Sequence, residues 1–358
     1  MKIVTIVGAR PQFIKAAPIS KVLRQQHREV LVHTGQHYDR EMSDIFFTEL
    51  AIPRPDYELG IGSGSHGWQT GQMLMRVEEV LQAERPDWVL VYGDTNSTLA
   101  GALAAVKLGI RVAHVEAGLR SFNRAMPEEH NRVLTDHCAD LLFCPTQTAV
   151  DLLAAEGVTQ GVHLVGDVMF DAARQFAEVA TARSTIVARL GLAPRGYALA
   201  TLHRPYNTDD PARLRLVLDA LNRLELPVVF PVHPRTRARL AEMGTAECAG
   251  QTATGLRCVE PVGYLDMLAL EQNARLILTD SGGVQKEAYF FAVPCVTLRP
   301  ETEWVETVQT GWNRLAWGDA ETVLAAARGP WPGDAPPPIF GDGHAAERIA
   351  ALLQTQGG

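Results

Sequence analysis

Short apolar runs alternate along the chain with longer stretches in which apolar residues recur every three or four positions. Runs rich in valine, isoleucine and leucine are typical of strands buried on both faces of a parallel sheet, and the stretches between them are typical of helices. The alternation therefore predicts βαβ units and an α/β fold. Strands are expected at residues 2–9, 28–35, 87–94, 111–118, 140–146 and 162–167, and in a second series at 197–204, 227–234, 275–283 and 294–300.

The two series of predicted strands are separated by a mostly helical segment, residues 166–196. A chain of 358 residues is also longer than one typical single-core domain. We therefore predict two Rossmann-like domains, residues 1–167 and 168–344. The closing segment, residues 345–358, is predicted to be a helix that could pack back on the first domain.

Composition narrows the classes of function. Hydrophobic residues make up 46% of the chain and charged residues 21%, which is ordinary for a globular protein. The net charge of −8 argues against general affinity for nucleic acid or for an anionic membrane, because both require a basic field. The first ten residues lack the features of a signal peptide, and no apolar run reaches about 18 residues, so the cytoplasm is the expected compartment.

The five cysteines are scattered and form no C-x-x-C pair. This spacing predicts neither a disulfide framework nor a structural zinc site. No metal is expected.

In open α/β sheets, ligands bind beyond the carboxyl ends of the strands. The first predicted strand ends in "GARPQFIK", where Gly8 permits a tight turn and Arg10 and Lys15 place positive charge at a helix start. This is a candidate phosphate site, although it lacks the G-x-G-x-x-G fingerprint. Asp94 follows the third strand and Glu116 the fourth. Asp94 taken alone is more often an N-cap, but four strands that end in polar groups favour a site.

Two strands of the second series are followed by histidines and arginines rather than by carboxylates. His203 and Arg204 follow one strand, and His233 and Arg235 follow the next. A lone histidine is more often structural, whereas two such clusters favour an anion.

The sequence "LTDSGGVQKEA" then gives a strand, a Ser-Gly-Gly turn at residues 281–283 and a helix start, an arrangement that exposes backbone N–H groups to phosphate. Glu287 lies in the first turns of that helix, where a carboxylate could accept hydrogen bonds from a ribose. The alternative interpretation is a capped helix with one unrelated glutamate.

Seven segments follow one another along the chain in a fixed order: "GARPQFIK", "HTGQHYD", "YGDTNST", "HVEAGLRS", "MPEEHNR", "TDSGGVQKEA" and "TEWVET". Together they resemble the non-hydrolysing UDP-N-acetylglucosamine 2-epimerases, and the resemblance covers essentially the whole chain. It implies a two-domain fold like that of the GT-B glycosyltransferases with a deep interdomain cleft, a homodimer and no added cofactor. It also implies inversion of the sugar's C2 by elimination of UDP to a 2-acetamidoglucal, followed by re-addition.

The resemblance assigns roles to individual residues. Asp94, Glu116 and Glu128 match the proposed acid/base carboxylates, whereas Glu129 is expected only to be solvated at a helix start. The positions that match groups proposed to bind the substrate, with His203 also assisting catalysis at the diphosphate, are Arg10, Lys15, Arg132, His203, His233, Ser281, Gly282, Gly283 and Glu287.

Several positions depart from the common bacterial pattern. Trp304 stands where the common pattern Thr-Glu-Arg-Pro-Glu has its arginine, and Lys286 stands where the common "QEEA" has its first glutamate. The common "HRREN" is "HRPYN" in this chain. Glutamines used in regulation are not evident in the segment "YDREMSDIFF". Other segments resemble the branch that epimerises UDP-2,3-diacetamido-2,3-dideoxyglucuronate.

UDP-GlcNAc is the first choice of substrate and this uronate is the alternative. A GT-B glycosyltransferase, a hydrolysing epimerase and a non-enzymatic UDP-sugar sensor are further alternatives.

Overall fold

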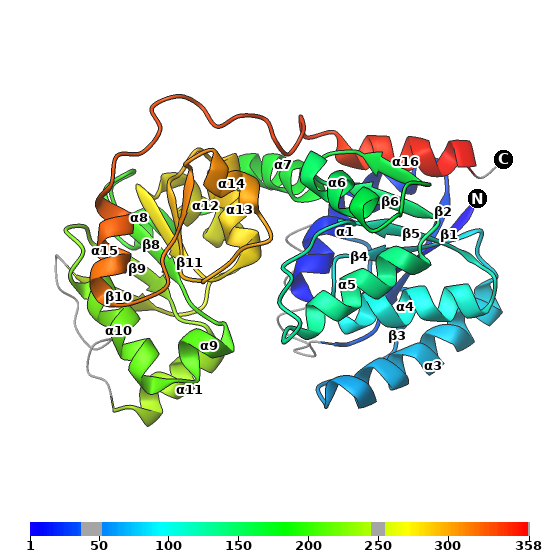
Figure 1. The fold of residues 1–358 in the computed structure, drawn as a ribbon, viewed down its shortest axis with the longest axis horizontal. Coiled ribbons are helices and arrows are strands. Elements are labelled where there is room, and N and C mark those ends of the chain that lie inside the picture. The colour runs from blue at the N-terminus through cyan, green and yellow to red at the C-terminus, as the bar shows by residue number, and fades with distance from the viewer. Residues whose placement is uncertain (37–51, 245–254, 357–358) are drawn as a thin grey trace. The chain divides into compact units, whose positions relative to one another are not determined.

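The computed structural model describes residues 1–36, 52–244 and 255–356. The chain divides into two compact units, the first formed by Met1–Arg174 and Pro338–Gly358 and the second by Gln175–Pro337. Each unit has a parallel sheet covered by helices (Figure 1). The predicted fold class, α/β with two Rossmann-like domains, is confirmed.

The first unit contains, within the described residues, a seven-stranded parallel sheet in the order β3-β2-β1-β4-β5-β6-β7. Its strands are β1 (Lys2–Val7), β2 (Arg28–His33), β3 (Tyr57–Glu58), β4 (Trp88–Tyr92), β5 (Arg111–Val115), β6 (Leu141–Cys144) and β7 (Val162–Leu164). Its helices are α1 (Arg10–Leu23), α3 (His66–Glu84), α4 (Asn96–Lys107), α5 (Pro127–Cys138), α6 (Gln147–Ala155) and α16 (Ala345–Gln356).

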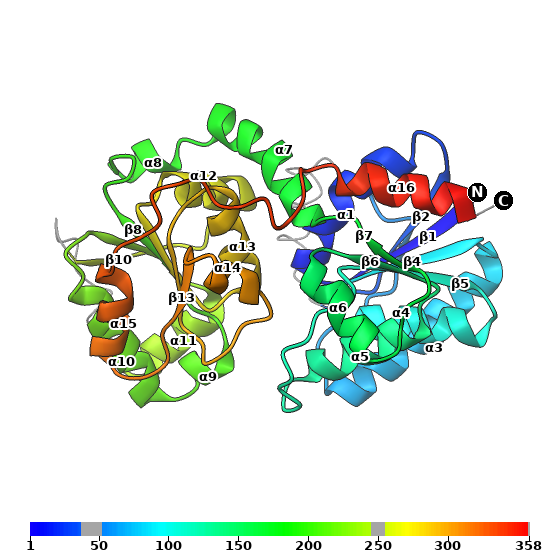
Figure 2. The same ribbon diagram turned by 45° about the horizontal axis from the view of Figure 1, so that its top comes forward.

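The core of the first unit explains why the apolar runs became strands. Alternate residues of β1, such as Val4 and Ile6, pack with their counterparts in β2 and β4 against Val77 of α3 and Ala102 of α4. The other face of the sheet is covered too, because α1 and α16 pack together there while α3, α4 and α5 lie side by side (Figures 1 and 2). A strand buried on both faces must be apolar at nearly every position.

The second unit repeats the topology with a sheet that has, among the described residues, six parallel strands in the order β10-β9-β8-β11-β12-β13. The strands are β8 (Ala198–Thr201), β9 (Val228–Pro231), β10 (Leu256–Val259), β11 (Leu276–Thr279), β12 (Cys295–Thr297) and β13 (Asn313–Leu315). The helices are α8 (Ile186–Arg189), α9 (Pro205–Thr208), α10 (Pro211–Asn222), α11 (Pro234–Glu242), α12 (Tyr264–Asn273), α13 (Gly282–Phe290), α14 (Val305–Gln309) and α15 (Ala320–Arg328).

In both sheets the order in which successive strands are added reverses at one point, between β1 and β4 in the first unit and between β8 and β11 in the second. At such a switch point the loops after the two strands diverge, and the crevice between them is where ligands bind in open α/β folds. The topology therefore gives each unit one expected binding edge.

The division between the units falls inside helix α7 (Val168–Arg183), seven residues after the predicted boundary at 167/168. The chain returns to the first unit between Pro337 and Pro338, seven residues before the predicted boundary at 344/345. Helix α16 packs on α1 and is held at its start by Asp171, whose Oδ2 accepts a hydrogen bond of 2.7 Å from the Ala346 amide.

Burial raises the pKa of Asp171 to about 6.

Cys258 is disulfide-bonded, whereas Cys138, Cys144 and Cys295 are free thiols. One bonded cysteine is not a disulfide framework, so it does not contradict the prediction from the spacing. Among the described residues no helix is long and apolar enough to cross a membrane.

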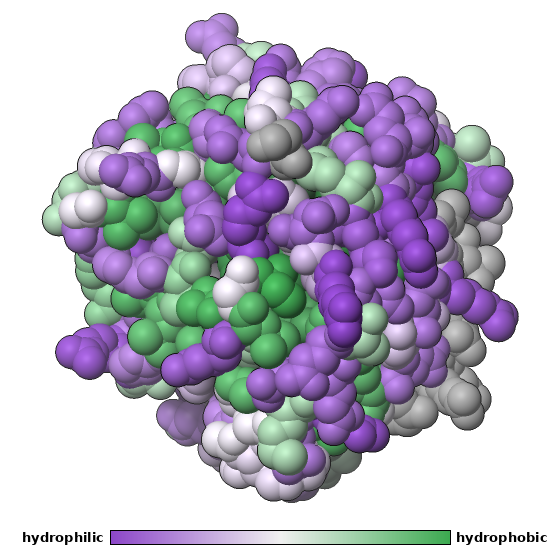
Figure 3. Space-filling view, turned by 90° about the vertical axis from the view of Figure 1, so that its right-hand side faces the viewer, coloured by the Kyte–Doolittle hydropathy of each residue, from purple (hydrophilic) through white to green (hydrophobic). Residues whose placement is uncertain are grey.

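The surface carries some large apolar side chains. Figure 3 shows one face on which a hydrophobic patch is bordered by hydrophilic residues. Among the exposed apolar side chains of the first unit, Trp68 and Met75 lie on α3 and Leu134 lies on α5.

Candidate active site

The first-unit candidates gather at the carboxyl ends of β1, β4 and β5, which are neighbours in the sheet. Arg10 and Lys15 belong to α1, directly after β1, while Asp94 follows β4 and Glu116 follows β5. The Lys15 ammonium donates to Oε1 of Glu116, and both side chains are more than nine-tenths buried. The fold therefore unites a cation and a carboxylate at the predicted edge.

Glu116 adopts a left-handed backbone conformation, with φ of 68°. This conformation is uncommon for a residue other than glycine and indicates a constraint that the surrounding structure imposes. The backbone amides of Glu116 and Ala117 both donate to the carbonyl of Phe143, each at 3.1 Å. At Gly93, with φ of 61°, a Cβ would lie only 3.2 Å from the Lys15 Nζ. Glycine there leaves room for the ion pair.

Asp94 is held by helix α5. Arg132 donates to the Asp94 carboxylate, and the Asn131 side chain donates to its carbonyl at 3.0 Å. Glu128 is half-buried and precedes Arg132 by four residues, so the two side chains lie on one face of the helix.

Glu129 differs from its neighbour in both burial and contacts. It is 5% exposed, and its carboxylate accepts from the Ser121 amide at 2.9 Å, the Phe122 amide at 2.8 Å and Arg132 at 3.0 Å. The prediction that Glu129 is a solvated helix-start residue is wrong. The loop before α5 folds back onto this carboxylate, and sequence spacing gave no signal of it.

Gln12 is a structural residue that the sequence analysis missed. Its Oε1 accepts from the amides of Gly8 and Ala9 at 2.8 and 3.0 Å, and its Nε2 donates to the Tyr92 carbonyl at 2.9 Å. The amides of the first glycine turn are therefore satisfied inside the protein. A phosphate at this edge would have to rely on side chains such as Arg10, which is half-buried.

His114, also missed, lies completely buried behind the site. Its Nε2 is 2.7 Å from the Gly93 carbonyl and its Nδ1 is 2.7 Å from the Asp136 carboxylate. Burial raises the pKa of Asp136, but hydrogen bonds and charge from His114 and Arg120 outweigh it, so the pKa is lowered overall. Through these contacts Asp136 and His114 hold the Gly93 carbonyl and so fix the turn between Tyr92 and Asp94.

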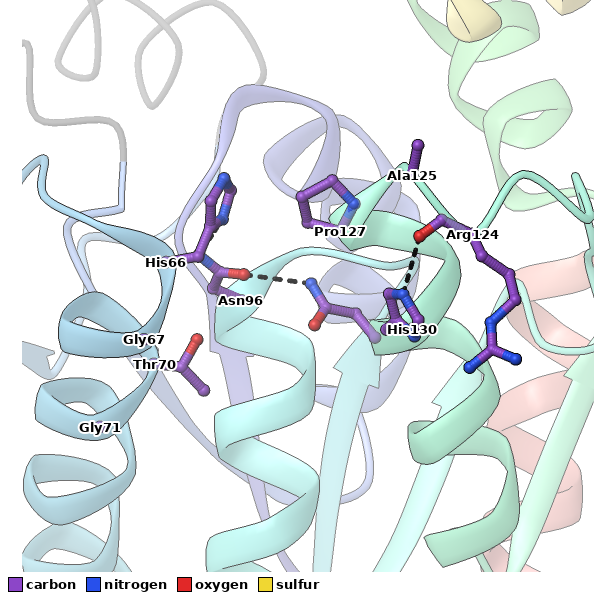
Figure 4. Close-up of a pocket in the computed structure, with 10 residues that line it drawn as sticks. His66, Gly67, Thr70, Gly71, Asn96, Arg124, Ala125, Pro127 and His130 are labelled. Carbon is purple, nitrogen blue, oxygen red and sulfur yellow. Dashed lines mark hydrogen bonds between the residues drawn. The ribbon is translucent and has the colours of Figure 1, made fainter.

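A pocket of about 530 Å³ opens beside Asp94, between the starts of α3, α4 and α5. Its wall includes His66, Asn96, Arg124 and His130 (Figure 4). Asn96 accepts a hydrogen bond of 3.1 Å from Asn131, the residue that also binds the Asp94 carbonyl. The segment in which regulatory glutamines were sought, residues 38–47, lies outside the described residues.

In the second unit, His203 follows β8 and Asp280 follows β11, the two strands of the switch point. The His203 Nδ1 lies 3.2 Å from the Asp280 Oδ1, and the backbone amides of His203 and Arg204 donate to the same carboxylate at 3.1 and 3.0 Å. Burial raises the pKa of Asp280, but these hydrogen bonds and the His203 charge lower it overall. Asp280 therefore stays ionised.

His233 and the Ser-Gly-Gly turn lie close to this pair. The His203 and His233 rings have centroids 5.9 Å apart. Ser281 caps helix α13, its side chain accepting from the Val284 amide at 3.4 Å, and Gly282 and Gly283 form the first turn. Without side chains, these glycines leave the helix N-terminus bare, as an anion site requires.

Glu287 is 4% exposed, and its Oε1 accepts a hydrogen bond of 2.9 Å from the Tyr264 hydroxyl. The contact orients the carboxylate. Two departures from the family pattern meet nearby, because the Lys286 ammonium lies 4.0 Å from the centre of the Trp304 ring. A cation–π contact thus occupies the positions at which the common pattern has a glutamate and an arginine.

Within the described ranges, no group of three or more histidine, cysteine or carboxylate side chains could hold a metal ion.

The family model described as UDP-N-acetylglucosamine 2-epimerase matches residues 21–354, nearly the whole chain. The chain belongs to the UDP-N-acetylglucosamine 2-epimerase family. It is accordingly an isomerase of nucleotide sugars, as the resemblance implied.

Members of the 2-epimerase family that are similar to this chain differ in their substrates. The UDP-N-acetylglucosamine 2-epimerase homolog of Methanococcus maripaludis is 56% identical over 90% of this chain and 91% of its own. The UDP-2,3-diacetamido-2,3-dideoxy-D-glucuronate 2-epimerase of Pseudomonas aeruginosa is 51% identical over 99% of both chains.

A crystal structure of the UDP-GlcNAc 2-epimerase of Methanocaldococcus jannaschii, in complex with UDP-GlcNAc and UDP, has a TM-score of 0.90. It is 44% identical, and the match covers 99% of this chain and 100% of that one. The fold is therefore that of the GT-B-like 2-epimerases.

Proposed function

We propose that this 2-epimerase interconverts UDP-GlcNAc and UDP-ManNAc by anti elimination and re-addition of UDP. The observation that carries the proposal is the placement of Asp94 and Glu116 after the neighbouring strands β4 and β5 of the first sheet, each bound to one cation. An edge rich in carboxylates suits a C2 inversion, which needs a base for one face of the sugar and an acid for the other.

In the first step a carboxylate removes the C2 proton while the C1–O bond to UDP breaks, which leaves a C1=C2 double bond. In the second step a carboxylic acid returns a proton to the opposite face of C2, and an oxygen of UDP adds back to C1. Charge and atoms balance, and no redox partner is needed. Glu116 and Glu128 are the proposed pair for the two faces, with Asp94 beside them.

The second-unit residues are proposed to hold the nucleotide. The bare N-terminus of α13 at Ser281, Gly282 and Gly283 suits a diphosphate, and His203 beside it suits the oxygen that leaves C1. Glu287 is proposed to accept from the ribose hydroxyls. Arg10 and His233 are the proposed further contacts to the phosphates.

Lys15 binds the Glu116 carboxylate, and Arg132 binds the carboxylates of Glu129 and Asp94. We propose that they act on the substrate mainly by fixing Glu116 and Asp94.

A second substrate deserves a test, because the Pseudomonas relative that acts on the diacetamido uronate is 51% identical over the full length. That sugar carries an extra carboxylate and an amide at C3. Lys286 and Trp304, which depart together from the common pattern, are the positions we would examine first for this difference.

We further propose a homodimer, supported by the exposed apolar side chains Trp68, Met75 and Leu134 on α3 and α5. The cytoplasm remains the compartment predicted from the sequence. The absence of recognisable regulatory glutamines predicts hyperbolic kinetics without an activator.

The deciding experiment is incubation in D₂O with UDP-GlcNAc alone, and separately with the diacetamido uronate, followed by NMR. UDP-ManNAc with deuterium at C2 supports the proposal. Free sugar plus UDP would indicate a hydrolysing enzyme, and turnover of the uronate alone would select the alternative substrate. No reaction with either sugar would overturn the epimerase proposal and favour a transferase or a sensor.

A further inference from the structure

The contact between His203 and Asp280 decides which nitrogen of the His203 ring carries a proton. The Nδ1 of His203 lies 3.2 Å from the Asp280 carboxylate. Asp280 is fully buried and accepts two backbone amides as well, so it remains a carboxylate with no proton to donate. A lone pair on Nδ1 would repel this carboxylate, so the contact is favourable only when Nδ1 carries the proton.

The partner of His233 imposes the reverse arrangement. His233 caps helix α11, and its Nδ1 lies 3.3 Å from the backbone nitrogen of Arg235. A backbone N–H always donates, so the His233 Nδ1 must present its lone pair. The proton of the neutral ring is then on Nε2.

We propose that His203 and His233, whose ring centroids lie 5.9 Å apart, are held in opposite tautomers by Asp280 and by the Arg235 amide. His203 presents a basic Nε2, and His233 presents an Nε2–H donor. Asp280 is thus a positioning residue for His203.

Asp280 is also held by hydrogen bonds that run through the Asn207 side chain. The Asn207 side chain donates to its Oδ2 at 3.1 Å and to the Leu298 carbonyl at 3.0 Å, and the Arg213 Nε donates to Asn207 at 3.1 Å. Asn207 is fully buried. These buried hydrogen bonds hold Asn207 against both Asp280 and the Leu298 carbonyl and so favour one geometry, which makes the orientation of Asp280 part of the fold of the second unit.

The consequence for catalysis rests on the proposed function. A diphosphate is an acceptor, so His203 can bind it through Nε2 only after gaining a proton, whereas His233 can donate to it as a neutral ring. His203 is then the ring that takes up a proton as UDP binds and releases it as UDP adds back. The ionisable groups that contact the His203 ring are the Asp280 carboxylate and the His233 ring.

The test is a two-bond proton–nitrogen correlation spectrum of the full chain with ¹⁵N-labelled histidine, recorded at mildly alkaline pH without ligand. The chain has 11 histidines, and His203→Gln and His233→Gln identify the two signals by their loss. We expect His203 protonated on Nδ1 and His233 on Nε2. The same tautomer in both rings, or fast averaging at His203, would overturn the proposal.

Asp280→Asn then tests the cause. We expect His203 to become a mixture of tautomers while His233 is unchanged, and turnover to fall by about 10²-fold. A fixed Nδ1–H tautomer that persists in this variant would overturn the role of Asp280. If Asp280→Asn does not fold, Asn207→Ala is the second variant, and it should broaden the His203 signal alone; an unchanged His203 signal there would overturn the role of the network.

Addition of UDP to the unmodified protein separates this inference from the proposed function. A new proton on the His203 Nε2 supports both. The predicted tautomers without any response to UDP would support the tautomer assignment and overturn the diphosphate site.

Discussion

Glu129 and Arg132 form a buried ion pair across one turn of helix α5, with 3.0 Å between Oε2 and Nη1. From this position Arg132 also reaches the Asp94 carboxylate. The adjacent acids Glu128 and Glu129 therefore differ in their surroundings, because Glu129 is buried and bound to the loop and the helix whereas Glu128 is half-buried.

Glu116→Gln and Glu128→Gln should each lower turnover by about 10²-fold or more and leave UDP affinity nearly unchanged. Both residues belong to the unit that lacks the proposed nucleotide cradle. Steady-state rates and calorimetry with UDP check this. Glu79→Gln is the matched control, because its side chain is 63% exposed on α3. A near-normal rate in either variant excludes that residue from proton transfer.

Glu129→Gln should act on stability rather than on chemistry. The NH2 group of glutamine would replace one carboxylate oxygen and face donors only, either the Phe122 amide or the Ser121 amide and Arg132. We expect a loss of about 3 kcal/mol or more in the free energy of unfolding, the usual cost of breaking a buried pair. Thermal unfolding measures it, with Glu128→Gln as the control that should unfold normally. Equal stability of the two variants would contradict the assignment.

Lys15→Met should destabilise the first unit by about 3–5 kcal/mol, because it removes an ammonium from a buried carboxylate. The double variant Lys15→Met/Glu116→Gln should recover most of that stability and stay inactive. Urea unfolding of both variants and of Glu116→Gln completes the cycle. Strictly additive losses would show that the two side chains do not interact.

His203→Ala and Glu287→Ala should weaken binding of UDP, measured by calorimetry, because they remove a diphosphate contact and a ribose contact. Tyr264→Phe is a useful companion to the second variant, since it removes the hydroxyl that donates to Glu287 but keeps the carboxylate. We expect a smaller effect from it. Unchanged UDP affinity in both alanine variants would place the nucleotide elsewhere.

Asp171 should make stability depend on pH. Burial raises its pKa to about 6, above the unfolded value, so the folded state favours the protonated form. Its contribution is fully present below about pH 4 and is lost as pH rises through about 6. Relative to Asp171→Asn, the protein should lose roughly 2 kcal/mol of unfolding free energy between pH 4 and 7. Urea unfolding at several pH values checks this, and a pH-independent difference would contradict it.

The sequence by itself determined the fold class and the edge of each sheet at which chemistry is found. Both follow from local properties. A strand buried on two faces must be apolar throughout, and parallel strands bring their carboxyl ends to one edge, so residues such as Asp94, Glu116 and His203 could be placed there without coordinates.

The tertiary structure decided which side chains bind one another. Lys15 and Glu116 are 101 residues apart, and nothing in the spacing of either links them. Glu128 and Glu129 look equivalent in sequence, but the loop that folds onto Glu129 buries only that one. His203 and His233 both follow strands, yet one faces a carboxylate and the other a backbone amide. The sequence pattern fixes the element on which a residue lies, whereas its burial, partner and protonation depend on segments that meet only when the chain has folded.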